Sequence, residues 1–68
     1  MTLSARNQLS GTIESVTLGD IMAHIVVRIG EQQVESIITR ASAEAMGLKK
    51  GDSVRAIVKS TEVMIQKD

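Results

Sequence analysis

The clearest pattern in the chain is an alternation of apolar and mixed positions over residues 21–29. The apolar positions are Ile21, Ala23, Ile25, Val27 and Ile29, and the positions between them are Met22, His24, Val26 and Arg28. A period of two residues is typical of a β-strand with one buried face. We therefore predict a strand at 21–29 that has one apolar face and a second face that is partly apolar.

Further segments rich in β-branched residues predict strands at 12–18, 33–39, 53–60 and, shorter, 63–65. Residues 1–9 show no clear period. Gly19-Asp20 and Gly30-Glu31 have the composition of tight turns between strands. Residues 48–52 predict another turn.

The segment 39–47 predicts a helix of about two turns. Thr39 or Ser42 can cap its start, Ala and Glu favour its interior, and Gly47 is a natural stop. One short helix between the third and fourth of five strands is the element order of an OB-like barrel. We therefore predict an all-β fold with one short helix, an OB-like five-stranded antiparallel β-barrel, formed by a single domain over 1–68.

The size of the chain limits how it can be stabilised. A domain of 68 residues buries only roughly 60% of the surface that its unfolded chain exposes. Cysteine is absent and His24 is the single histidine, so we expect no disulfide and no metal cation site. Oligomerisation and ligand binding remain as sources of stability. Apolar residues expected on outer or edge positions suggest a subunit interface, and the alternative is that they are scattered surface hydrophobes. These residues are Met22, Val26, Ile37 and Ile57.

Charge and composition narrow the function. Eight Lys and Arg balance eight Asp and Glu, and there are no aromatic residues, which argues against a general nucleic-acid binder. The apolar runs are too short to span a bilayer, and no basic start leads into an apolar signal region. No catalytic constellation stands out, and His24 is expected at a surface or an interface. We expect a cytoplasmic protein that is not an enzyme.

Two short clusters combine a cation with hydroxyl groups. The first is Ser4-Ala5-Arg6-Asn7, and the second is Lys59-Ser60-Thr61. With Thr39 at the start of the predicted helix, they could surround an oxyanion, because cations attract it and hydroxyl and backbone N–H groups donate directed hydrogen bonds. Spacing alone leaves the ordinary alternative of solvated surface charge open.

The chain also resembles a known family over essentially its whole length. The most specific segment is Ser4-Ala5-Arg6-Asn7-Gln8-Leu9 with Gly11, followed by Ile38-Thr39 leading into Ser42, by Met46-Gly47-Leu48 and by 56–64. These segments are similar to the molbindins, the molybdate-binding Mop family. The resemblance implies an OB-like barrel, assembly as a hexamer, and molybdate or tungstate bound at subunit interfaces.

The resemblance also implies a set of binding residues. Ser4, Arg6 and Lys59 match the motif best, with Asn7, backbone groups around Ala5 and Ser60, and then Thr39. The alternative is a small OB-like or swapped-hairpin protein that binds nucleic acid, because the Leu-x-x-Gly-Asp-x-Val turn at 48–54 is shared with such proteins. The resemblance does not distinguish molybdate from tungstate.

Overall fold

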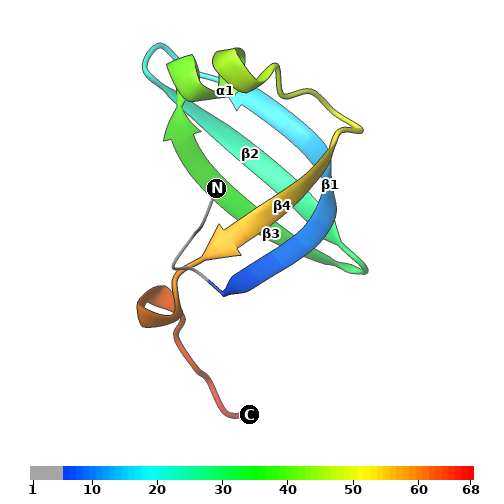
Figure 1. Ribbon diagram of the computed structural model, residues 1–68, viewed down its shortest axis with the longest axis vertical. Helices are drawn as coiled ribbons and strands as arrows, with labels where there is room; N and C mark the ends of the chain where they lie inside the picture. Colours follow the sequence, from blue (N-terminus) through cyan, green and yellow to red (C-terminus); the bar gives the residue numbers. More distant parts are fainter. Residues whose placement is uncertain (1–5) are drawn as a thin grey trace.

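Strand pairing determines the architecture of the protein, for which a computed structural model describes residues 6–68 (Figure 1). The strands form one antiparallel sheet in the order β3-β2-β1-β4. Its elements are β1 (Asn7–Leu18), β2 (Met22–Ile29), β3 (Gln32–Thr39), α1 (Arg40–Met46) and β4 (Ser53–Val58), followed by a 3₁₀ turn at Ser60–Glu62. The strand predicted at 21–29 is confirmed as β2.

The long strand β1 changes partner along its length. Its first half pairs with β4, from Asn7 opposite Val58 to Thr12 opposite Ser53. Its second half pairs with β2, and a β-bulge interrupts the register where Ile13 faces Val27 and Ser15 faces Val26. A bulge bends and twists the strand that contains it. The bend lets β1 pair with β4 over its first half and with β2 over its second half.

Gly11 lies where β1 passes closely over β2. A Cβ atom at this position would lie 2.5 Å from the carbonyl oxygen of Arg28 and 2.8 Å from Cγ1 of Val27. Both distances are shorter than a non-bonded contact allows, so the crossing requires glycine at residue 11.

The short helix begins and ends as predicted. Thr39 adopts an extended backbone conformation, and its hydroxyl oxygen accepts a hydrogen bond from the N–H of Ser42 at 3.1 Å. Gly47 has φ +62° and donates its N–H to the carbonyl of Glu44 at 3.0 Å. An α-helix of seven residues is marginal by itself, so α1 depends on these caps and on packing against the sheet.

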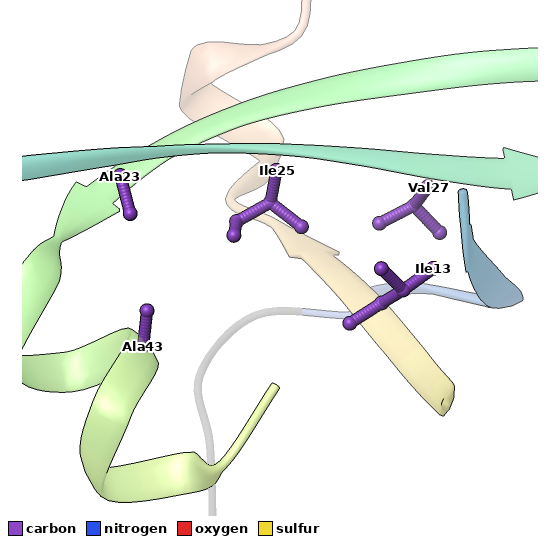
Figure 2. Packing of buried hydrophobic residues seen from close by; sticks show 5 residues of the cluster. All are labelled: Ile13, Ala23, Ile25, Val27 and Ala43. Carbon is purple, nitrogen blue, oxygen red and sulfur yellow. The ribbon is translucent and has the colours of Figure 1, made fainter. Parts of the chain in front are cut away.

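The core lies on the concave face of the sheet, beneath α1 (Figure 2). Its buried residues are Ile13, Ala23, Ile25, Val27 and Ala43. Figure 2 shows Ala43 of α1 facing Ala23 of β2, and Ile13 facing Val27. Three of the five apolar positions predicted for β2 are therefore buried and Ile29 is half-buried, whereas Ile21 precedes the strand and is 76% exposed.

Two parts of the predicted barrel differ from the structure. Over residues 6–68 the sheet has four strands and is not closed, because 63–65 forms no strand and Met64 is 92% exposed. The cause is the 3₁₀ turn, closed by a hydrogen bond from the N–H of Glu62 to the carbonyl of Lys59 at 2.9 Å, after which the chain leaves the sheet (Figure 1). The general class, mostly β with one short helix, is confirmed.

The ends of two strands also differ from the prediction. β1 begins at Asn7 rather than residue 12, because β4 supplies a backbone partner for 7–11 that no alternation in the sequence indicates. β4 ends at Val58, two residues before the predicted end. Over residues 6–68, no helix is long and apolar enough to cross a membrane.

Candidate functional site

The pairing of β1 with β4 brings the two predicted cationic clusters to the same end of the sheet. Asn7, the first residue of β1, lies opposite Val58, the last residue of β4. Arg6 directly precedes this terminal pair and Lys59 directly follows it. Figure 1 shows the start of β1 beside the end of β4. Both Arg6 and Lys59 are exposed, and Asn7 is half-buried. Ser4 and Ala5, the remaining predicted residues of the first cluster, lie outside the described residues.

In the part of the chain that the structure describes, no ion pair neutralises the charges at this end. Within residues 6–68, the ion pairs are His24–Glu35, Arg28–Glu14, Arg40–Glu44 and Lys49–Asp52. None of these pairs involves Arg6 or Lys59. The nearest acidic residue along the chain from Lys59 is Glu62, at the end of the 3₁₀ turn. Two cations with exposed donors at one end of a strand pair produce a positive potential there.

Ser60 begins the 3₁₀ turn directly after Lys59. The carbonyls of Lys59 and Ser60 accept hydrogen bonds from the N–H groups of Glu62 and Val63, at 2.9 Å and 3.5 Å. The turn therefore uses carbonyl oxygens, which repel an anion, in its own hydrogen bonds. The Ser60 side chain is exposed at the same end of the sheet as Lys59.

Thr39 lies at the opposite end of the sheet. It pairs with Met22 at the first residue of β2, near Leu18 at the end of β1, whereas the cationic end lies at Asn7. The Thr39 hydroxyl also donates to Oγ of Ser42 at 2.8 Å, in addition to accepting from the Ser42 N–H. One chain does not bring Thr39 together with Lys59, and a site that contains both would take them from two copies.

The lysines of the 48–52 turn lie at the other end of β4. Lys49 forms an ion pair with Asp52, with 3.1 Å between Nζ and Oδ1, and its backbone N–H donates to Oδ2 at 3.0 Å. The hydrogen bonds from the Lys49 side chain and backbone hold the pKa of Asp52 below its ordinary value. These contacts shape the turn that leads into β4 and do not contribute to the cationic end.

An apolar groove of about 290 Å³ lies between β3 and β4, the two edge strands. Its walls include Val34 and Ile38 of β3 and Val54, Ala56 and Val58 of β4, and it reaches the core at Ile25. The groove follows from the open sheet, so the prediction of a closed barrel missed it.

Other apolar side chains lie on exposed surfaces. Ile37, Ile57 and Met22 are 61%, 47% and 43% exposed, as the sequence predicted, whereas Val26 is half-buried. The described chain thus exposes much of its apolar surface.

The described residues thus define a class of protein: a small antiparallel β domain that carries two exposed cations, Arg6 and Lys59, at one end of its sheet. Comparisons with known proteins identify its family. The family model described as "TOBE domain" matches residues 3–65. Molybdenum-pterin-binding protein 3 of Clostridium pasteurianum is 46% identical over 66 residues, which are 96% of this chain and 97% of that protein.

Solved structures give the same result. A molybdate binding protein from Sporomusa ovata superimposes with a TM-score of 0.94 at 36% identity, covering 98% of this chain and all of the other. The cytoplasmic molybdate-binding protein ModG, in a form with molybdate bound, superimposes with a TM-score of 0.82 at 31% identity, covering 88% of this chain and 43% of that one. The chain therefore belongs to the TOBE domain family and, within it, to the molybdenum-pterin-binding proteins of the Mop type, which confirms the resemblance noted in its sequence.

Proposed function

We propose that this protein binds molybdate or tungstate at the end of the sheet where β1 begins and β4 ends. The observation that carries the proposal is the convergence of Arg6 and Lys59, which lie 53 positions apart in the sequence, at one end of a single strand pair. The names of the relatives support the choice of ligand, since they are called molybdenum-pterin-binding and molybdate-binding proteins. The role is binding rather than catalysis, in the storage and homeostasis of the oxyanion.

The chemistry of the donors suits an unprotonated dianion. Arg presents a planar fork of N–H donors, Lys an ammonium group and Ser a hydroxyl, and neither cation can accept a hydrogen bond. Charge-assisted hydrogen bonds of this kind are the stronger ones in proteins. Ser4, Asn7, Ser60 and backbone groups around Ala5 complete the proposed donor set.

We also propose that the protein is a homo-oligomer and that the site lies between copies. The buried core of residues 6–68 is small, one side of it opens into the groove between β3 and β4, and Met64 and Ile65 are 92% and 88% exposed. A second copy that covers these apolar surfaces would supply the burial that one chain lacks. It would also allow Thr39 of one copy to approach Lys59 of another. The family resemblance implies a hexamer, and ModG is described as cytoplasmic, the compartment we propose here.

Native mass spectrometry with and without molybdate tests the proposal, because it reports the number of subunits and of bound anions together. We expect a hexamer whose mass rises by whole numbers of molybdate ions. A stable folded monomer at micromolar concentration would contradict the proposed assembly. Calorimetry with molybdate and with duplex DNA separates the proposal from a nucleic-acid binder, which would show heat with DNA alone.

A further inference from the structure

One carboxylate joins three strands at the point where β1 changes partner. Glu14 is the extra residue of the β1 bulge. Its Oε1 accepts hydrogen bonds from Nε of Arg28 at 3.1 Å and from a second guanidinium nitrogen of Arg28, and its Oε2 accepts one from Nε2 of Gln33. Arg28 belongs to β2 and Gln33 to β3. The Glu14 side chain is 28% exposed, so these contacts are partly shielded from water.

The strand pair that carries the cationic end is attached to the rest of the sheet near this bulge. Residues 7–12 of β1 pair with β4, and β4 has β1 as its sole strand partner in the described sheet. The groove separates the inner side of β4 from β3. The orientation of this two-stranded ribbon relative to β2 and β3 therefore depends on the Gly11 crossing, on Ile13 in the core and on the Glu14 contacts.

The length of the ribbon amplifies any change at the bulge. Arg6 lies eight residues before Glu14, which is roughly 26 Å at about 3.3 Å per strand residue. A rotation of roughly 2° at the bulge would move the end of such a ribbon by roughly 1 Å. Hydrogen bonds to oxygen keep their strength only over about 2.7–3.2 Å, so a displacement of this size is enough to lose one.

We propose that Glu14 is a positioning residue for the oxyanion site: by holding the bulge, it sets the position of Arg6 and Lys59 relative to the rest of the fold and to a neighbouring copy. The inference rests on the proposed function, since it requires an anion site at the end of the ribbon that is completed across an interface.

Electrostatics alone makes the opposite prediction. Glu14→Ala removes a negative charge, and a less negative protein attracts an anion more strongly. If Glu14 positions the ribbon, the same substitution weakens binding. The sign of the change in affinity for molybdate therefore separates the two effects.

Calorimetric titration with molybdate is the test, on the wild type, on Glu14→Ala and on the control Glu31→Ala. Glu31 lies in the exposed turn between β2 and β3, and its replacement makes the same change in charge. We expect Glu14→Ala to bind about tenfold more weakly, the value of one well-placed charge-assisted hydrogen bond, and Glu31→Ala to stay within about twofold of the wild type. Glu14→Gln keeps an acceptor for Arg28, so its affinity should be intermediate. Equal affinities for Glu14→Ala and Glu31→Ala would overturn the inference.

Two further variants keep the test decisive. In an Arg6→Ala background, Glu14→Ala should weaken binding less than it does in the wild type, because one of the two cations that Glu14 positions is already absent; a full, additive loss would contradict the inference. Gln33→Ala removes one contact of Glu14 without a change in charge, and it decides the matter should circular dichroism show that Glu14→Ala is unfolded. We expect binding about threefold weaker for Gln33→Ala, and wild-type affinity would refute the inference. A wild type that does not bind molybdate would instead refute the proposed function.

Discussion

Arg6 and Lys50 provide a direct test of whether molybdate is held by directed hydrogen bonds or by general charge. Both residues are exposed, and replacement by Ala removes one positive charge in each case. Arg6 lies at the proposed site, whereas Lys50 lies before β4, nine residues from Lys59. The six residues of β4, Ser53–Val58, lie between Lys50 and Lys59 and alone span roughly 17 Å, about two Debye lengths at physiological ionic strength. The charge of Lys50 is therefore largely screened from the site.

The magnitudes differ accordingly. Loss of a charge-assisted hydrogen bond costs about 1.5–3 kcal/mol, so Arg6→Ala should weaken molybdate binding by roughly tenfold to a hundredfold. Lys50→Ala should change it by less than about twofold. Arg6→Lys keeps the charge and loses the planar fork, and should fall between them. Calorimetry at 0.15 M salt measures all three. Equal losses for Arg6→Ala and Lys50→Ala would mean that general electrostatics, and not a formed site, attracts the anion.

Three further predictions address selectivity, the strand crossing and the helix cap. Tungstate should displace molybdate in competition calorimetry and millimolar sulfate should not, because sulfate is smaller and a pocket sized for molybdate would hold it with stretched hydrogen bonds; displacement by sulfate as readily as by tungstate would indicate a generic anion site. Gly11→Ala should lower the free energy of unfolding by about 1–3 kcal/mol in denaturant melts, owing to its contact with the Arg28 carbonyl, and Gly19→Ala, whose Cβ would lie 3.1 Å from its nearest neighbour, should cost less. Thr39→Ala should cost about 1 kcal/mol through loss of the helix cap, while Thr39→Ser keeps the cap; an unchanged affinity for molybdate in a folded Thr39→Ala protein would remove Thr39 from the proposed ligand set.

Local patterns in the sequence predicted the elements whose limits are set by neighbouring residues. The alternation at 21–29 indicated β2, and Thr39 and Gly47 marked the two ends of α1. The amino-terminal half of β1 was missed, because its backbone partner in β4 lies more than 40 residues away and its side chains do not alternate. The bulge at Glu14 was missed for a similar reason, since only the register against β2 reveals it.

The candidate site was also predicted only in part from the sequence. Arg6 and Lys59 were named from their residue types and from a family resemblance, but spacing alone does not show that they share one end of the sheet. That depends on the register between β1 and β4, which only the structure provides. Thr39 shows the limit of a motif: the residue matches the resemblance in the sequence, but in one chain it lies at the opposite end of the sheet from Lys59, and its hydroxyl is bonded to Ser42.

The position of the site and the open shape of the sheet are two results of the same topology. Because β1 pairs with β4 at one end and with β2 at the other, the ribbon that carries Arg6 and Lys59 extends from the core, and its inner side borders the apolar groove. A second copy that covers the groove would lie beside the strands that end at those cations. Burial of apolar surface and closure of the anion site would then occur in one step, so a bound oxyanion would stabilise the assembly and the assembly would raise the affinity for the oxyanion.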